Sequence, residues 1–171
     1  MLRWSQLRKA IEERITRPLR GRVELHSTRY RRSADQEGRV WITVDGQEVF
    51  SMATVIHLVP LWERAAAIAT AEPDLSPEAA NGRAVAEFAA QGRFTQLTFY
   101  SALDEYLNLS IERALGSSNM LIRALALIDR RLGRRRFEAL RLAPGEHALV
   151  RLSYSLRAEA EGWEPSAQVV A

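Results

Sequence analysis

The amino-acid sequence predicts a single α+β domain, in which an antiparallel sheet of about four strands packs with several α-helices. Apolar and polar residues alternate with the period of a strand in four segments: residues 22–31, 39–45, 47–57 and 147–157. Between the third and fourth segments, apolar residues recur at the spacing of helices. Strands, then helices, then a strand is an order typical of α+β folds. The length fits one domain over residues 1–171, with a loose tail at 162–171.

A helix is predicted first, over residues 5–16. Its apolar positions form one inward-facing stripe: Trp4, Leu7, Ile11 and Ile15. Pro18 ends it, because proline cannot continue the hydrogen bonds of a helix.

Asp45-Gly46 predicts a tight hairpin between the second and third strands, since both residue types accept the positive φ of a type I′ turn. A two-residue turn fixes the register, with these facing pairs: Val44 and Gln47, Ile42 and Val49, Trp41 and Phe50. One sheet face then carries Ile42 and Val49, and the other carries Trp41, Phe50 and Met52. Both faces are partly apolar, so we expect helices on one face and a partial cover, or a partner, on the other.

Four helices are predicted in the middle of the chain. Pro60 suits the first turn of a helix that runs to Ala71 and carries Leu61, Trp62, Ala65 and Ile68. Ser76-Pro77-Glu78 begins a second helix, which ends near Gly92. The other two run over residues 94–107 and 110–116.

Residues 105–142 contain the clearest amphipathic segment. Leu121, Leu125, Ile128 and Leu132 share one helical face. Ser118 or Asn119 caps its start, and Gly133 takes the left-handed position after its end. A second helical segment, 134–142, follows, so an arginine-dense elbow joins the two.

The last predicted strand, 147–157, joins the N-terminal meander. Its apolar residues alternate with polar ones: Ala148, Val150, Leu152, Tyr154 and Leu156.

The composition, with 47% hydrophobic and 26% charged residues, is that of a globular protein. The absence of cysteine excludes disulfides and thiolate chemistry and fits a reducing cytoplasm. No apolar run approaches the ~18 residues of a membrane span, and the basic N-terminus has no apolar core of a secretory signal. We therefore expect a cytoplasmic protein that does not enter a membrane.

Charge is segregated along the chain, although the net charge is only +3. Residues 1–39 have a net charge of +6, residues 40–112 of −7 and residues 113–141 of +6. The two basic blocks either neutralise the acidic middle or form a separate basic face.

The candidate nucleic-acid-binding residues form two groups. The first, the arginine elbow, is defined as Arg123, Arg130, Arg131, Arg134, Arg135 and Arg136. It is interpreted either as helix-end electrostatics with ion pairs or as a site for phosphate backbones. The second group is strand-borne and has an aromatic residue among its arginines: Arg29, Tyr30, Arg31 and Arg32. This arrangement suits single-stranded RNA, or is a solvated strand end.

Weaker patterns concern metals and catalysis. His26, His57 and His147 lie on or beside predicted strands, but their spacing does not require a metal site, and we predict no metal or cofactor. Asp35, Glu37 and Asp45 fit loop and turn chemistry as well as a carboxylate cluster for acid–base chemistry or Mg²⁺. No nucleotide-binding glycine motif, nucleophile elbow or zinc-protease motif occurs, and no catalytic residue is assigned.

Three blocks resemble a family of uncharacterised bacterial proteins named for a Shigella reading frame. They are HSTRYRRSADQEGRVWITVDGQEVF at 26–50, YLNLSIERAL at 106–115 and LIRALALIDRRLGRRR at 121–136. The resemblance covers under half of the chain and does not extend over residues 59–91. It implies one compact bacterial domain, and it implies no activity.

The sequence thus favours a non-catalytic cytoplasmic protein that binds an anionic partner, RNA in particular, through its arginines. The alternative is a protein-interaction or regulatory module, including a homodimer, that uses Trp41, Phe50 and Met52 as its partner-binding surface. A small hydrolase comes third, and it requires a histidine beside a carboxylate in a pocket.

Overall fold

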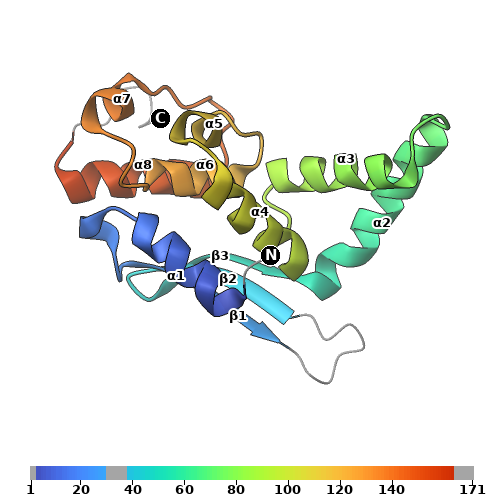
Figure 1. The fold of residues 1–171 in the computed structure, drawn as a ribbon, viewed down its shortest axis with the longest axis horizontal. Helices are drawn as coiled ribbons and strands as arrows, with labels where there is room; N and C mark the ends of the chain where they lie inside the picture. Colours follow the sequence, from blue (N-terminus) through green and yellow to red (C-terminus); the bar gives the residue numbers. More distant parts are fainter. Residues whose placement is uncertain (1–2, 30–37, 164–171) are drawn as a thin grey trace.

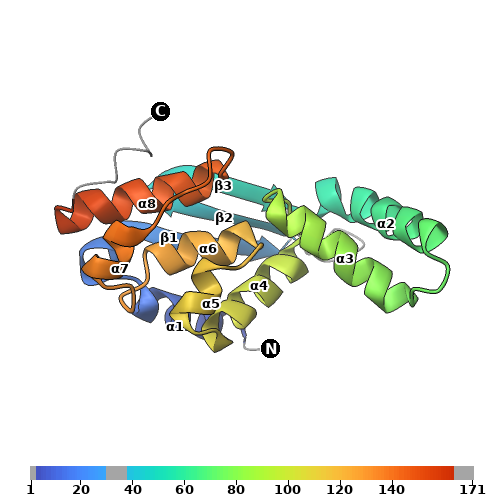
Figure 2. The same ribbon diagram turned by 90° about the horizontal axis from the view of Figure 1, so that it is seen from above.

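The computed structural model describes residues 3–29 and 38–163 and has an α+β architecture (Figure 1). Helices α1, α4, α6 and α8 lie over one face of a small antiparallel sheet (Figure 2). Within the described residues the sheet has three strands, in the order β1-β2-β3: Val23–Arg29, Gly38–Val44 and Gln47–Ala53. The predicted N-terminal meander is therefore confirmed.

The predicted Asp45-Gly46 turn is confirmed. Asp45 has a φ of 50° and Gly46 a φ of 78°, the left-handed values that a type I′ turn requires. Val44 pairs with Gln47, as the two-residue turn dictates.

Beyond the turn the predicted register is wrong, because β3 contains a bulge. Thr43 pairs with Glu48, but Ile42 pairs with Phe50, so Val49 is the extra residue. One extra residue moves the following side chains to the opposite face of the strand. Phe50 is consequently buried beside Ile42, instead of sharing a face with Trp41.

The helices follow the sheet in chain order, apart from α1. Their bounds are α1 Trp4–Arg14, α2 Thr54–Ala71, α3 Pro77–Ala90, α4 Gln96–Asn108, α5 Ile111–Leu115, α6 Met120–Leu127, α7 Arg134–Ala139 and α8 Ala148–Glu161, with a 3₁₀ turn at Arg17–Leu19. Side chains of Ser76, Ser110 and Asn119 accept backbone N–H groups at the starts of α3, α5 and α6, where caps were predicted.

The predicted strand 147–157 is wrong, since this segment forms α8. The alternating apolar letters conceal a helical burial pattern: Leu149, Val150, Ser153, Tyr154, Leu156, Arg157 and Ala158 are buried. His147 caps the start and Gly162, with a φ of 63°, ends the helix. Ser153 and Arg157, two polar residues inside, hid the three- and four-residue spacing.

Two further boundaries differ from the predictions. Helix α2 begins at Thr54, directly after β3, so Pro60 lies inside the helix and not in its first turn. Helix α6 ends at Leu127, and Gly133, with a φ of −78°, is the N-cap of α7 and not a left-handed residue. The buried carboxylate of Asp129 ends α6 by accepting the backbone N–H of Arg131.

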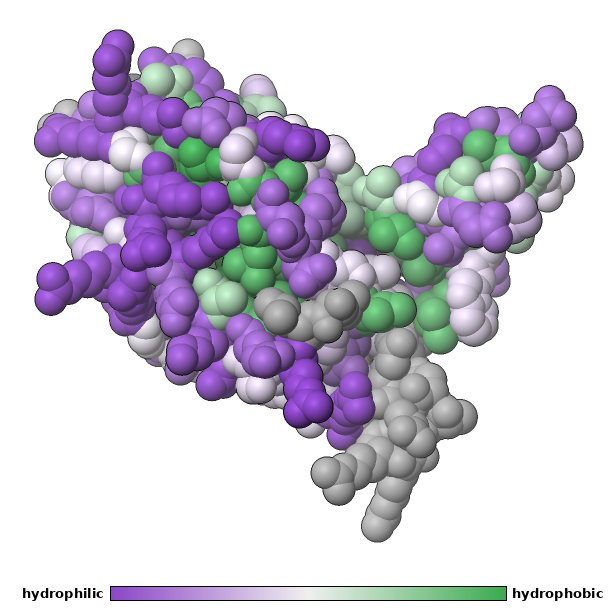
Figure 3. Space-filling view, viewed as in Figure 1, coloured by the Kyte–Doolittle hydropathy of each residue, from purple (hydrophilic) through white to green (hydrophobic). Residues whose placement is uncertain are grey.

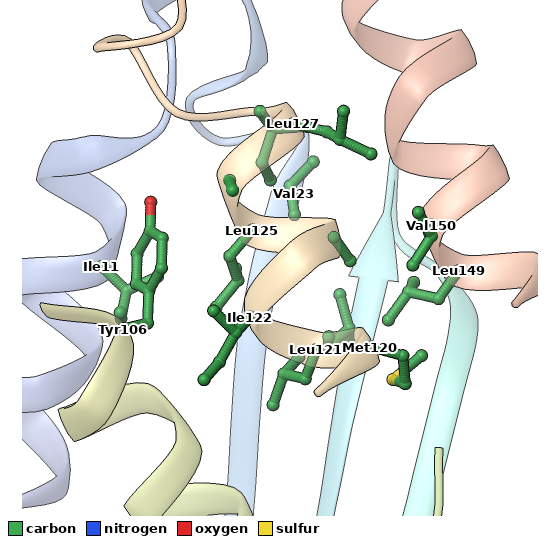
Figure 4. Close-up of a cluster of buried hydrophobic side chains, with 14 of the residues drawn as sticks. Ile11, Val23, Tyr106, Met120, Leu121, Ile122, Leu125, Leu127, Leu149 and Val150 are labelled. Carbon is green, nitrogen blue, oxygen red and sulfur yellow. The ribbon is translucent and has the colours of Figure 1, made fainter. Parts of the chain in front are cut away.

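The main core surrounds α6, in which seven of the eight residues are buried. Figure 4 shows its side chains pointing towards Tyr106 and Ile11 on one side and towards Leu149 and Val150 of α8 on another. A helix that is apolar all round needs cover on every side, and α1, α4, α8 and the sheet provide it.

Helices α2 and α3 pair with each other and project from the end of the sheet (Figures 1 and 2). We call residues 54–90 the arm. It has a separate apolar cluster of its own: Leu61, Ile68, Ala80, Ala84 and Phe88. No helix of the described ranges is long and apolar enough to cross a membrane.

Candidate interaction surfaces

The arginine elbow is anchored by a buried carboxylate. Asp129 follows α6, and its side chain is fully buried. Its Oδ2 accepts from the Tyr106 hydroxyl at 2.5 Å and from Nε and Nη2 of Arg131 at 2.9 and 2.7 Å. Burial and the neighbouring Asp129 raise the pKa of the Tyr106 hydroxyl, and the hydrogen bond to Asp129 raises the pKa of the Arg131 guanidinium. The tyrosine therefore remains a hydrogen-bond donor and the arginine a cation.

Several arginines near the elbow satisfy carbonyl groups at helix ends. Arg14 donates to the carbonyls of Tyr106 and Leu107, at 3.2 and 2.5 Å, and Arg131 donates to that of Leu109 at 2.9 Å. All three carbonyls lie at the end of α4, where backbone acceptors lack intrahelical partners and the helix dipole favours cations. These two guanidinium groups therefore hold α4 against α1 and the elbow.

Arg157 of α8 also donates to backbone carbonyl groups near the elbow. It is buried and donates to the carbonyls of Asp129 and Leu132, at 3.1 and 2.9 Å. Its charge is balanced by Glu161 at 3.3 Å, which also accepts the Thr16 hydroxyl. Burial lowers the pKa of the Arg157 guanidinium, and the nearby carboxylates oppose that change.

Most arginines of the elbow are paired with carboxylates. The pairs are Arg123–Glu146, Arg131–Asp129, Arg134–Glu138 and Arg136–Glu112. Of these carboxylates, only Glu112 belongs to the acidic block 40–112. The arginines of the basic block 113–141 are therefore neutralised mainly by carboxylates within or just after that block. Helix-end electrostatics accounts for Arg131.

Two elbow arginines differ from the others. The side chains of Arg130 and Arg135 are exposed and form no ion pair or hydrogen bond with the residues that the structure describes. Arg135 lines an open hollow of about 610 Å³ together with Arg131, Gly133, Arg134, Arg136 and Ala139, whereas Arg130 is not part of this lining. The guanidinium groups of Arg130 and Arg135 are therefore the part of the elbow that is available to an anion.

The strand-borne arginine group is only partly described. Arg29 is exposed at the end of β1, far from α7 (Figure 1). Tyr30, Arg31 and Arg32 lie outside the described residues. The structure therefore does not bring Arg29 together with the elbow.

The three residues predicted for a partner-binding sheet face are not together. Phe50 is buried against Phe94 and Phe99, and Met52 is partly buried against the same core. Trp41 alone lies on the opposite face. This follows from the bulge at Val49.

The indole of Trp41 already has neighbours from its own chain. His26 stacks on it with a centroid distance of 5.0 Å, and the guanidinium of Arg39 lies over it at 5.0 Å. Arg39 in turn bonds Ser51 and Glu48, and His26 bonds Thr43 at 2.9 Å. Among the described residues, the surroundings of Trp41 on this face are thus polar and bonded within the chain.

The other two histidines have structural partners. His57 lies 3.5 Å from Nε of Arg93, and burial, then Arg93, lowers the pKa of its imidazole. His147 accepts the backbone N–H of Leu149 through Nδ1 at 3.1 Å, and burial, then Arg151, lowers its pKa. The residues described contain no group of three His, Cys, Asp or Glu placed to hold a metal ion.

The site that a hydrolase would require is only partly assembled. His147 follows the buried Glu146 in an open hollow of about 510 Å³ that Ser118 and Arg123 also line. Glu146 is paired with Arg123, and Nδ1 of His147 caps α8. Both groups therefore have structural contacts within the chain. Asp45 bonds Arg22 at 2.9 Å from each carboxylate oxygen, while Asp35 and Glu37 lie outside the described residues.

The surface that sequence reasoning missed is the outer face of the arm. Ile56, Val59 and Trp62 of α2 are 65%, 54% and 59% exposed, and Leu97 near the base of the arm is 55% exposed. Figure 3 shows apolar surface where the arm leaves a mostly hydrophilic body. The sequence pattern predicted a strand at residue 56 and placed Trp62 in a helix with Leu61, and it did not separate the two faces of that helix. Its usable signal was that apolar residues surround α2 on all sides.

A three-stranded antiparallel sheet covered by helices on one face, with a projecting helical hairpin, defines an α+β protein. The chain belongs to the SF0329 protein family, whose model matches residues 3–158. The match includes the arm, over which the sequence blocks alone showed no resemblance. No curated protein and no solved structure matches the chain.

Proposed function

We propose that this protein is a non-catalytic protein-interaction module that binds its partner along the outer face of α2. One observation carries the proposal: Ile56, Val59 and Trp62 are large, apolar and more than half exposed on a projecting helix. Apolar side chains that cluster on a surface typically mark a contact site. The absence of cysteine supports action in the reducing cytoplasm.

The structural context supports the same reading. Two ion pairs join residues of the arm: Arg64–Glu87 and Arg83–Glu72, each at 2.6 Å. Its inner cluster fixes α2 against α3. The outer apolar residues are therefore presented on a preformed surface, which reduces the entropy that binding has to offset.

Photo-cross-linking tests the proposal. A photoreactive phenylalanine derivative replaces Val59 on the outer face, or Asn81 on the exposed polar surface of α3 as a matched control. In bacterial cells that express the chain, we expect a discrete cross-linked product from position 59 and none from position 81. The proposal is wrong if position 59 yields only the free monomer.

A second candidate function is binding of RNA or another polyanion through the elbow. The observation that favours it is that Arg135, which has no ion pair among the described residues, lines the arginine-rich hollow, while the exposed Arg130 of the same elbow is also unpaired there. Fluorescence anisotropy with a short labelled RNA and a DNA duplex at roughly 50 and 200 mM salt measures it, because phosphate contacts weaken steeply over that range. Arg130→Glu with Arg135→Glu should abolish binding, while Arg8→Glu on α1 should not. Equal binding by both variants would remove this candidate.

A further inference from the structure

We infer that the occupant of the outer face of α2 is a basic amphipathic helix of another protein. The inference rests on the proposed function and adds the chemistry of the partner. The outer stripe is defined by the exposed residues that repeat along α2: Ile56, Val59, Trp62, Glu63, Ala66 and Thr70.

The stripe has the form of a helix-binding surface. Most of its residues follow one another at alternating spacings of three and four: Ile56, Val59, Glu63, Ala66 and Thr70. This is the pattern of a seam that packs against another helix. Large residues occupy its first half and small ones its second half, so a partner helix can approach closely at Ala66. The Thr70 hydroxyl is already bonded to the Ala66 carbonyl, at 2.9 Å, and requires no partner.

Glu63 determines the charge of the partner. It is exposed on the same face as Ile56 and Ala66 and has no ion pair within the described part of the chain. The neighbouring Arg64 is taken by Glu87, and Arg83 is taken by Glu72. A carboxylate in the middle of an apolar seam is desolvated when a partner covers it, so the partner must supply a cation.

The whole arm favours a basic ligand. Residues 54–90 contain five carboxylates and two arginines, a net charge of −3. Such a field attracts a positively charged helix and repels an acidic one. Helix-in-groove recognition of this kind uses anchors at three- and four-residue spacing, which matches the stripe.

Two model peptides test the inference. Both are labelled 18-residue helices with the same leucine stripe, one with lysine and one with glutamate on its flanks, and their binding to the full chain is followed by anisotropy. We expect the lysine peptide to bind at least tenfold more tightly. Glu63→Lys should reverse this order, and Glu78→Lys, with the same charge change off the stripe, should preserve it. Val59→Ser should weaken binding of both peptides.

The outcomes separate this inference from the function on which it rests. Equal binding of the two peptides, no binding of either, or an order unchanged in Glu63→Lys overturns the basic helix. If position 59 still cross-links to a protein, the interaction module stands with a different partner. A dimer in sedimentation equilibrium that Val59→Ser dissociates assigns the stripe to a second copy and also overturns the inference. If position 59 gives no cross-link at all, both the proposed interaction module and the basic helical partner are wrong.

Discussion

The hydroxyl of Tyr106 in α4 donates to the buried carboxylate of Asp129 at 2.5 Å, and this contact links the middle of the chain to the arginine elbow. Arg131 completes the group with two further bonds to Asp129. The path of the chain after α6 depends on these three side chains, because Asp129 turns it and Arg131 attaches it to α4.

Removing the Tyr106 hydroxyl should therefore destabilise the fold. Tyr106→Phe leaves a buried carboxylate with one donor fewer, and we expect the free energy of unfolding to fall by about 1–3 kcal/mol. Urea denaturation measures it. Tyr100→Phe is the control: its hydroxyl meets Ser27 in a partly exposed place, so water replaces the lost bond and the change is smaller. Equal losses in the two variants would contradict this view of Asp129.

Stability should decline as the pH falls below 6.5. Burial lowers the pKa values of His57 and His147 below that ordinary value, so the unfolded chain takes up protons there that the native chain does not. The free energy of unfolding therefore decreases as the pH falls below 6.5.

A cap-preserving substitution isolates His147. His147→Asn keeps a side-chain acceptor for α8 and removes the titrating group, so the slope over this window should decrease while stability at pH 7 is retained. His57→Asn combined with it should flatten the window further. Thermal denaturation across the pH series gives the answer, and an unchanged slope in both variants would refute the assignment.

Gly92 should not tolerate a side chain. Its φ is +73°, and a Cβ there would lie 2.5 Å from Nε2 of His147. Gly92→Ala should lower the free energy of unfolding by about 1–3 kcal/mol, from the left-handed backbone and from the contact together. In a double-mutant cycle, His147→Asn should recover only the part of the lost free energy of unfolding that comes from the contact with the imidazole. Full additivity of the two changes would show that the imidazole does not limit this position.

Substitution of two adjacent residues of α2 should change the free energy of unfolding by very different amounts. Leu61 is buried in the arm, and Leu61→Ala should cost about 2–4 kcal/mol. Trp62 is largely exposed, and Trp62→Ala should change the stability of the monomer by less than about 0.5 kcal/mol. Chemical denaturation of dilute protein measures both, and a large loss in Trp62→Ala would place that indole inside the fold.

Local chemistry in the sequence predicted some elements well. Asp45-Gly46 determined its own turn, because few other conformations suit that pair, and Pro77 after Ser76 marked the start of α3. Such signals act within two or three residues. They are therefore independent of the rest of the fold.

Other features depended on contacts that a one-dimensional pattern does not contain. Arg157 is buried because the carbonyls of Asp129 and Leu132 need donors, and nothing near residue 157 in the sequence indicates them. The segment 147–157 therefore looked like a strand. The bulge at Val49, which places Phe50 in the core, likewise has no signal in the sequence pattern. The elbow arginines were identified from sequence, but their division into paired and unpaired groups required the structure.

The arm and the body bury their apolar side chains in separate clusters. The arm can therefore open without disturbing the core around α6, and its amides should exchange with deuterium at a lower protection than those of the body. Binding to the outer stripe would slow exchange along α2 and α3 while leaving α6 unchanged. Hydrogen exchange thus reports occupancy of this surface before the partner has been purified.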